Sequence, residues 1–427
     1  MNTNRYIAEL NQDFFDGKLP PAFVEGLAEL PVDRDDVRAY MERTFRLMQE
    51  GGFHADDLSK LQGEVLGSLI ARILPGAWNG KIPPITLAGR HRLIDRLIRV
   101  NPWRDTTRPG RLLDLGCGFP PDTTVELAES MAHWTVVGGD PSLPAYLLHD
   151  DDGNYSTFDR DKQVIYFQPD LPSVESWNAL LEDSEATRAR FERLLQDALA
   201  VDPSPDPEQL AIDPIKKYER DNLSFVHGGI GQLDIEPVDV MRCFNVLFYF
   251  DNGFRRDAMG WFRMLLLEGG ILITGGNWAL SIESRYYVFQ KVRERLVGRE
   301  FAFSIDNLSP LAIVTWYTNH DDDEEIALLT ELVRVIRSDD AFMSRFYEVS
   351  DRLRARFNVC PRGTDGFYGG VDPTMPAGEL WETIAKIGEE LVAELGSAAV
   401  EVLNRSGRRA RLNEVGHIAV EIPDLVY

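Results

Sequence analysis

The sequence has few cysteines, a deficit of basic residues and no long apolar run. Its three cysteines, Cys117, Cys243 and Cys360, lie far apart and form no C-x-x-C pair, which argues against a disulfide framework or a cysteine zinc site. Lys and Arg number 45 against 69 Asp and Glu, and the formal charge of −24 opposes binding to nucleic acid or to an anionic membrane surface. No stretch approaches the roughly 20 apolar residues of a membrane span, and the N-terminus lacks the pattern of a signal peptide. We therefore expect a cytoplasmic protein without nucleic-acid or membrane partners.

The acidic residues also show no pattern of metal ligands. The runs at 150–152 and 321–325 consist of carboxylates adjacent in sequence, which rarely converge on one ion, so we interpret them as solvated loops and predict no metal site. The length of 427 residues exceeds one ordinary core and predicts two or three structural units.

A glycine-containing stretch at residues 111–124 is the clearest local signal. Leu112, Leu113 and Leu115 are typical of a short buried strand, and Gly116 and Gly118 let the backbone pass close to a ligand. A helix is predicted to start directly afterwards, near 122–124. Backbone N–H groups at such a turn favour a ligand with an anionic or carboxylate end.

A second short apolar strand, residues 134–140, ends in Asp140. This acid lies 22 residues after Gly118, close to the ~20-residue spacing at which a carboxylate accepts hydrogen bonds from ribose hydroxyls. A plain turn-forming role is the alternative. The preceding glycine turn favours the ribose role.

The remaining pattern alternates between strands and helices in the middle of the chain and is helical at both ends. Helices are expected at 35–50, 56–75, 86–100, 254–267, 283–297, 324–337, 341–357 and 378–404, with a further helical region at 174–200 that is broken near 183–184. Strands are expected at 163–168, 223–229, 238–250, 271–274, 300–305 and 311–317, and a terminal hairpin pairs 410–413 with 417–422. Because the link between 305 and 311 is too short for parallel strands, we expect five parallel strands followed by an antiparallel hairpin.

Residues 109–319 resemble the class I S-adenosylmethionine-dependent methyltransferases, through Asp114-x-Gly116-x-Gly118 and the acid at Asp140. The resemblance implies an α/β, Rossmann-like fold with a seven-stranded, mostly parallel sheet whose last strand is antiparallel. It divides the chain into a helical N-terminal cap (1–108), a cofactor-binding core (109–319, with an insertion at 150–220) and a mainly helical C-terminal region (320–427).

The same resemblance implies S-adenosyl-L-methionine as the cofactor. It places the methionine part at the first glycine turn, the ribose at Asp140 and the adenine near the third core strand. Two departures stand out: Pro120 and Pro121 replace the usual third glycine, and Gly229 and Ile230 stand where an acid often meets the adenine amino group. The implied cofactor-binding residues are Asp114, Gly116, Cys117, Gly118, Asp140, Pro141, Ser142, Gly229, Ile230 and Asn245.

Candidate catalytic residues follow the core strands, because acceptors in this fold bind beyond the carboxyl ends of the strands. Asn245 could orient an acceptor or merely fix a loop, and His227 could serve as a base or as a satisfied core residue. Tyr249 could line an acceptor site or pack in the core. Arg90 and Arg92 could meet the cofactor carboxylate, although a solvent-facing position suits them equally.

Several functions stay open at this point. We expect methylation of oxygen or nitrogen on a small molecule. The segment 243–251 also resembles the fourth strand of the chemotaxis receptor glutamate methyltransferases, which favours a protein carboxylate or side chain as an alternative. A non-catalytic cofactor-binding regulator is a further hypothesis, and a nicotinamide-dependent oxidoreductase is disfavoured by Pro121. The sequence is compatible with a homodimer.

Overall fold

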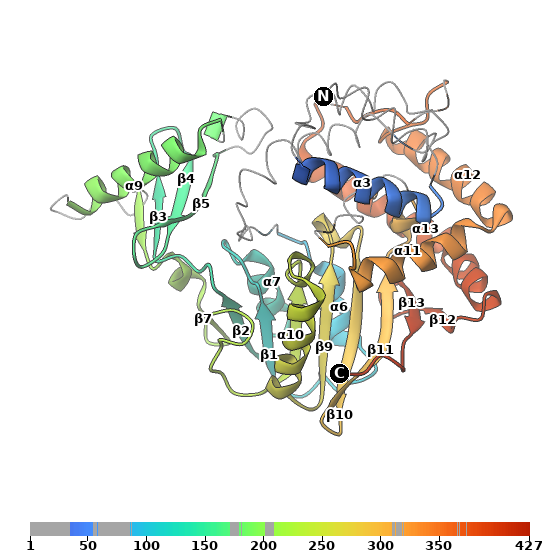
Figure 1. Ribbon diagram of the computed structural model, residues 1–427, viewed down its shortest axis with the longest axis horizontal. Coiled ribbons are helices and arrows are strands. Elements are labelled where there is room, and N and C mark those ends of the chain that lie inside the picture. The colour runs from blue at the N-terminus through green and yellow to red at the C-terminus, as the bar shows by residue number, and fades with distance from the viewer. Residues whose placement is uncertain are drawn as a thin grey trace.

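The computed structural model describes residues 35–53, 58, 86, 88–170, 179–180, 182–200, 209–309, 312, 318, 320–364, 366, 368–372 and 374–427. In this part of the chain a nine-stranded sheet forms the centre, and a four-stranded sheet projects from one side of it (Figure 1). A layer of helices lies at the opposite end. No described helix is long and apolar enough to cross a membrane.

The parallel half of the central sheet contains the five core strands that the sequence predicts. They run in the order β7-β2-β1-β8-β9, and all neighbouring pairs are parallel. Their bounds are Leu223–His227 (β7), Thr135–Asp140 (β2), Arg111–Leu115 (β1), Val238–Phe244 (β8) and Leu266–Gly276 (β9). Because the strands are parallel, their carboxyl ends meet at one edge. The prediction of an α/β, Rossmann-like and mostly parallel sheet is confirmed.

The antiparallel half corrects one expectation. Residues 285–292 form strand β10 (Arg285–Val292) rather than a helix, and β10 pairs with both β9 and β11 (Arg295–Phe303). The antiparallel hairpin is therefore 285–303. The predicted partner strand at 311–317 lies, apart from residue 312, outside the described residues.

The predicted terminal hairpin is confirmed as β12 (Ala410–Leu412) and β13 (Ile418–Glu421). It adds to the edge of the main sheet, because β13 pairs with β11. The sheet consequently has nine strands where the sequence predicts seven.

Helices cover both faces of this sheet. On one face, α6 (Arg92–Val100) and α7 (Asp122–Ser130) pack through a cluster that includes Ile94, Leu97 and Leu127. On the other face, α10 (Asn252–Leu265) packs through a cluster that includes Met259 and Phe262. The predicted helix at 86–100 begins only at Arg92, and residues 88–91 form a turn.

The N-terminal and C-terminal helices share one hydrophobic cluster. Helices α3 (Asp35–Glu50), α11 (Glu324–Arg337), α12 (Asp340–Phe357) and α13 (Ala377–Arg405) pack together against β11 and β13. The helices predicted at 35–50, 324–337, 341–357 and 378–404 are therefore present. The helix predicted at 56–75 lies outside the described residues, apart from residue 58.

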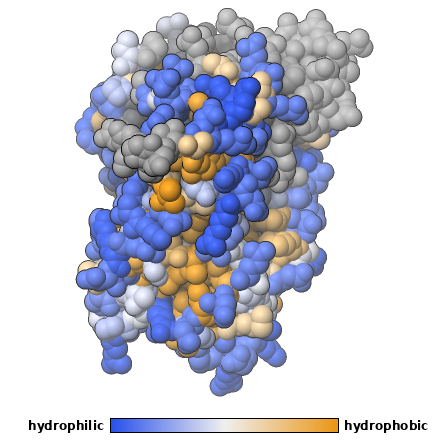
Figure 2. Space-filling model, turned by 90° about the vertical axis from the view of Figure 1, so that its left-hand side faces the viewer, coloured by the Kyte–Doolittle hydropathy of each residue, from blue (hydrophilic) through white to orange (hydrophobic). Residues whose placement is uncertain are grey.

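The four-stranded sheet lies in the chain between β2 and β7. Its order is β5-β4-β3-β6, with bounds Val164–Gln168 (β5), Tyr155–Phe158 (β4), Tyr146–His149 (β3) and Leu210–Ile212 (β6). Helix α9 (Ser184–Ala200) covers one face through Phe191 and Leu195. Figure 2, viewed from the side on which this sheet projects, shows apolar side chains near the middle of the surface and hydrophilic ones around them.

Candidate functional site

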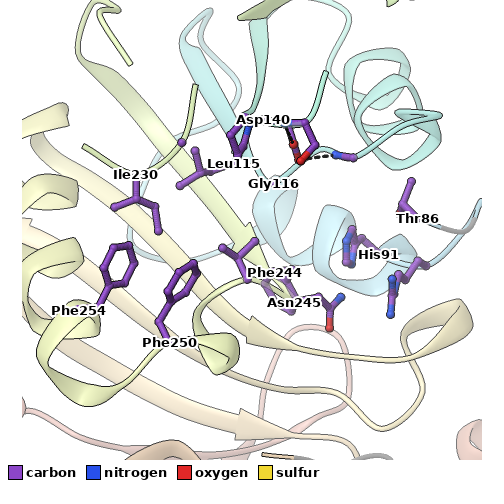
Figure 3. A pocket seen from close by; sticks show the side chains of 16 residues that line it. Thr86, His91, Leu115, Gly116, Asp140, Ile230, Phe244, Asn245, Phe250 and Phe254 are labelled. Carbon is purple, nitrogen blue, oxygen red and sulfur yellow. Dashed lines mark hydrogen bonds between the residues drawn. The ribbon is translucent and has the colours of Figure 1, made fainter. Parts of the chain in front are cut away.

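A cavity opens at the carboxyl ends of β1, β2 and β8. It encloses about 730 Å³ of empty space, counting its open mouth, and we call it the first cavity. Its lining residues are Thr86, Arg90, His91, Leu115, Gly116, Gly118, Asp140, Pro141, Ser142, Gly229, Ile230, Phe244, Asn245, Val246, Phe250 and Phe254. In Figure 3 aromatic and aliphatic side chains gather at one end, whereas Thr86 and His91 lie at the other.

The glycine turn forms part of the floor of the first cavity. Gly116 and Gly118 have φ values of +79° and +67°, a region that residues with a side chain rarely adopt. A Cβ on Gly116 would come within 2.3 Å of Val246 Cγ2. The Gly116 N–H donates to the Gly139 carbonyl at 2.7 Å, which fixes the turn to the end of β2. The sequence therefore places glycine where the backbone bend and the close approach both require it.

Asp140 lies beside this turn and joins it to the next loop. Its carboxylate accepts hydrogen bonds from Gly118 N–H at 2.9 Å and from Ser142 N–H at 2.7 Å. Figure 3 shows Asp140 close to Gly116 at the edge of the cavity. Burial raises the pKa of the Asp140 carboxyl, and the two backbone donors oppose that rise. The Asp140 carboxylate thus lines the cavity as a hydrogen-bond acceptor whose orientation is fixed by these two bonds.

Asp114 and Cys117 are placed below the turn and do not line the first cavity. The Asp114 carboxylate accepts two bonds from the fully buried Arg242, at 2.8 Å from Nε and 2.6 Å from Nη2, and one from Thr124 Oγ1 at 2.5 Å. Arg242 also pairs with Asp95 of α6. The acid of the predicted motif therefore supports the turn from beneath. The Cys117 side chain is buried, and burial raises the pKa of its thiol.

Residues 86 and 88–91 form a wall beside the first cavity, and Thr86, Arg90 and His91 line it. The backbone N–H of Gly89 donates to both oxygens of Glu126 on α7, at 2.8 and 2.9 Å. Arg90 lines the cavity, and its buried Nε has no hydrogen-bond partner among the described residues. Burial lowers the pKa of Arg90, and the nearby Tyr249 hydroxyl opposes this. The wall thus presents a guanidinium group to the cavity.

His91 is the second polar residue of the wall, and its tautomer follows from the bonds around it. The Asn277 backbone N–H donates to Asn245 Oδ1 at 3.0 Å, so Asn245 Nδ2 is the donor to Asn277 Oδ1 at 3.1 Å. Asn277 Nδ2 then donates to His91 Nδ1 at 3.1 Å. Burial, Arg242 and Arg90 hold the pKa of His91 well below its usual range, so the ring is neutral and its proton is on Nε2.

Asn245 directly follows β8 and adopts a left-handed conformation with φ +58°. It lines the first cavity, and both atoms of its amide group are bonded to Asn277. This contact matches the alternative in which Asn245 fixes a loop. The backbone reversal also ends the predicted strand at Phe244, and residues 247–249 continue as a 3-10 helix (η4, Leu247–Tyr249).

The other two candidate catalytic residues lie outside the lining of the first cavity. His227 ends β7 beside Asp140, and it is exposed rather than part of the core. Tyr249 lies in η4, where burial raises the pKa of its hydroxyl and Arg90 opposes the rise. Tyr249 is therefore a neighbour of the cavity-lining Arg90 and not itself part of the lining.

The apolar end of the first cavity includes residues that the sequence pattern did not single out. Phe250 and Phe254 stack on each other with ring centroids 4.1 Å apart, and Figure 3 shows them beside Ile230. They stand where the chain enters α10, directly after the fourth core strand. Their apolar character and their place after a core strand could have identified them as part of the site. His91 and Thr86 were missed because their place depends on contacts with Asn277 and Thr123.

The first cavity can bind and orient a ligand, but its described lining offers no base that is free to take a proton. Asp140 holds two backbone donors, and His91 presents an N–H group. The lining combines a flat apolar end, an acid, a glycine turn and a cation. This arrangement suits an elongated ligand with an aromatic group at one end and a carboxylate at the other.

Comparison with known proteins gives weak similarities to solved structures. No protein-family model and no curated protein matches the chain. PKMT2 from Rickettsia typhi in complex with AdoHcy is 16% identical over 45% of this chain and 25% of that chain, with a TM-score of 0.21. N-methyltransferase NodS from Bradyrhizobium japonicum WM9 is 14% identical over 43% of this chain and 60% of that chain, with a TM-score of 0.21.

A third similar structure is SAM-bound CalS10, an amino pentose methyltransferase from Micromonospora echinaspora. It is 14% identical over 51% of this chain and 64% of that chain, with a TM-score of 0.22. The matches span less than two thirds of each of the three structures. TM-scores of 0.21 to 0.22 do not identify a function for this chain. The fold is described from the strand order of the sheet.

Proposed function

We propose that this protein is a class I S-adenosylmethionine-dependent methyltransferase. The observation that carries the proposal is the junction of the Gly116–Gly118 turn with Asp140 on one side of the first cavity. At this place the glycine turn that follows β1 and the acid that ends the adjacent strand β2 lie side by side, and together they can hold the two halves of a nucleoside with an amino-acid tail.

The residues present fit this cofactor. Arg90 has an unpartnered Nε among the described residues and would hold the cofactor carboxylate. Asp140 would accept the ribose hydroxyls, and Ile230 with Phe254 would enclose the adenine ring. When bound, the cofactor supplies a methyl group activated by a positively charged sulfonium. Asp114 acts one layer below, where it holds the turn through Arg242.

The acceptor that we propose is a nitrogen or oxygen atom of a small molecule. The described lining has no free base, so the site favours an acceptor that already carries a lone pair, such as a neutral amine or a carboxylate. The protein would then contribute mainly position, which can supply about 7–11 kcal/mol of the barrier reduction. The likeness of residues 243–251 to the chemotaxis receptor methyltransferases supports a protein carboxylate as a second candidate.

Titration calorimetry tests the cofactor class. The full chain is titrated with S-adenosylmethionine, S-adenosylhomocysteine and nicotinamide adenine dinucleotide in parallel. We expect the two sulfur nucleosides to bind and the dinucleotide to fail. Binding of the dinucleotide alone would overturn the proposal.

The carboxylate role of Arg90 has its own test. Arg90→Leu should weaken S-adenosylhomocysteine about 10- to 100-fold, the value of a hydrogen-bonded ion contact. Methylthioadenosine, which lacks the amino-acid tail, should bind the variant and the wild type equally. Arg92→Leu is the matched control, because Arg92 does not line the first cavity. An equal loss for both nucleosides would reject the role.

Asp140→Ala tests the ribose contact. It should weaken both S-adenosylhomocysteine and methylthioadenosine about 10- to 100-fold, because both ligands carry the ribose. Affinities that stay at the wild-type value would remove Asp140 from the site. A melting temperature measured alongside shows whether the loss of the Gly118 and Ser142 contacts has loosened the fold.

A further inference from the structure

A second cavity lies behind the wall of the first one. It encloses about 860 Å³, counting its open mouth, and it is bounded by α6, the η5 turn (Ala279–Ser281), the η6 turn (Ile305–Leu308), α13 and the β12–β13 loop. It shares no lining residue with the first cavity. Arg90 and His91 line the first, whereas Arg92 and Leu93 line the second.

The partition between the two cavities is held by hydrogen bonds between Ser281 and residues 90–93 and carries backbone strain. Leu280 and Ser281 adopt the left-handed region with φ values of +52° and +62°. Ser281 N–H donates to the Arg90 carbonyl at 2.8 Å, and Leu93 N–H donates to Ser281 Oγ at 3.0 Å. Non-glycine residues in this region cost about 1–3 kcal/mol each and cluster at functional sites.

His417 supplies a buried donor without a partner at the second cavity. Asn413 Oδ1 accepts from the backbone N–H of His417 at 3.0 Å, so Asn413 Nδ2 donates to Tyr286 Oη at 2.9 Å. The Tyr286 hydroxyl then donates to His417 Nδ1 at 3.0 Å. Burial lowers the pKa of His417 to about 4, so the neutral ring keeps its proton on Nε2. This N–H has no partner in the described chain.

Asp306 supplies a buried acceptor that is also unsatisfied. Its Oδ2 accepts from the Glu283 N–H at 2.6 Å, whereas its Oδ1 is buried and has no partner among the described residues. Both Asp306 and His417 line the second cavity. A buried donor or acceptor left unsatisfied costs about 1–3 kcal/mol, so a ligand or water that completes these two bonds would be stabilised in the cavity.

Two arginines of α6 add positive charge to the same lining. Arg92 pairs only loosely with Glu382 at 3.3 Å and Glu389 at 3.7 Å, and both glutamates are mostly exposed. Arg96 is exposed, and no ion pair involving it is found in the described chain. Partly exposed pairs of this kind are worth less than about 1 kcal/mol, so an incoming carboxylate can replace them.

Gly388 leaves room for such a ligand. It lies inside the 29-residue helix α13 and lines the second cavity, and a Cβ at this position would meet no heavy atom within 4 Å. Glycine in a helix interior costs about 1 kcal/mol relative to alanine. No neighbouring atom of the described residues lies close enough to require glycine at position 388. The effect of this glycine is therefore to leave open space in the second cavity.

We propose that the second cavity binds a small zwitterion of the α-amino acid class. Its ammonium group would donate to Asp306 Oδ1, and its carboxylate would accept from Arg92, Arg96 and the Nε2–H of His417. The site is separate from the proposed methyl-transfer site, and its test does not depend on turnover.

Thermal shift and calorimetry of the full chain with each proteinogenic amino acid test this proposal. We expect at least one amino acid to raise the melting temperature of the wild type by about 2 °C or more at millimolar concentration. Gly388→Ala should respond in the same way, whereas Gly388→Leu, which fills the space, should not. Asp306→Asn should weaken the same amino acid about tenfold or more.

Two results would overturn the second site. Either no amino acid stabilises the wild type, as expected if only water fills the cavity, or Gly388→Leu responds as the wild type does. S-adenosylhomocysteine titrations on the same variants separate this proposal from the proposed function. Failure of that nucleoside to bind the wild type would reject the methyltransferase assignment and leave the amino acid result standing.

Discussion

The floor and the wall of the first cavity are built differently. The floor consists of strand ends, and its shape is set by backbone bonds such as Gly116 N–H to Gly139 O at 2.7 Å and Gly118 N–H to Asp140 at 2.9 Å. The wall at residues 86 and 88–91 is held by side chains that come from distant parts of the sequence, namely Glu126, Asn277 and Ser281. A short sequence motif is enough to predict the floor. The wall can be recognised only from the tertiary structure.

Arg242 connects the floor to α6, the helix that follows the wall in the chain, and its loss should have the largest effect. Its guanidinium is fully buried between Asp114 under the floor and Asp95 on α6. Arg242→Leu would leave two buried carboxylates without their cation, at a cost of about 3–5 kcal/mol. Urea denaturation followed by circular dichroism measures this loss.

The matched control for this change is Arg220→Leu. Arg220 pairs with Glu129 at 2.6 Å, but both side chains are about half exposed (46% and 56%), so the control should lose no more than about 1 kcal/mol. Equal midpoints for the two variants would show that the buried cluster does not join the floor to α6.

A change in the floor alone should have the next largest effect. Gly116→Ala forces an alanine into φ +79° and places its Cβ 2.3 Å from Val246 Cγ2. We expect a loss of about 2–4 kcal/mol, shared between a lower melting temperature and weaker S-adenosylhomocysteine binding.

Val246→Ala separates the two causes of that loss. It removes the Cγ2 atom that the new Cβ meets, so the double variant should recover the part due to overlap and keep the part due to backbone strain. A double variant that is no better than Gly116→Ala would place the whole effect in the backbone.

The smallest predicted effect concerns pH and the wall side of the charge cluster. Burial raises the pKa of Asp95 from 3.8 to about 7, so the folded protein holds this proton more tightly than the unfolded chain does. Stability should therefore fall as pH rises from about 4 to about 7 and level off above that. Between pH 5.5 and 8 the contribution is about 2 kcal/mol at most.

Asp95→Asn should reduce this slope, which thermal melts across the pH range can measure. Glu325, whose pKa burial also raises to about 7, pairs with Arg285 and is not part of the Asp95–Arg242 cluster. Glu325→Gln is therefore the control, and it should remove a slope of the same sign without touching the wall. A slope in Asp95→Asn identical to that of the wild type would contradict the assignment.

The fold was predictable where local sequence signals agree with tertiary contacts. The five parallel strands and the helices at 35–50 and 324–337 follow from apolar patterns that burial later satisfies. The hairpin β10–β11 was missed because its turn residues, Arg293 and Glu294, adopt φ values of +50° and +61°. Such turns usually contain Asn or Gly, and without them the sequence pattern predicts a helix.

The residues of the site that directly follow core strands were also predictable from the sequence. The glycine turn, Asp140 and the Gly229–Ile230 loop all line the first cavity, because they follow strands whose ends must meet at one edge. Asp114, Cys117, His227 and Tyr249 do not line it, since a motif gives the position of a residue but not the direction of its side chain. His91 required the Asn245–Asn277 contact, which spans 32 residues.

The buried charge cluster also limits which substitutions can be accepted during evolution. Asp95, Asp114 and Arg242 come from three separate elements, and replacing Arg242 alone would leave both buried carboxylates without their cation. Neutral drift at one position is therefore blocked unless the others change with it. Among homologues that keep this architecture, we expect the three positions to be retained as a set or exchanged together for apolar residues.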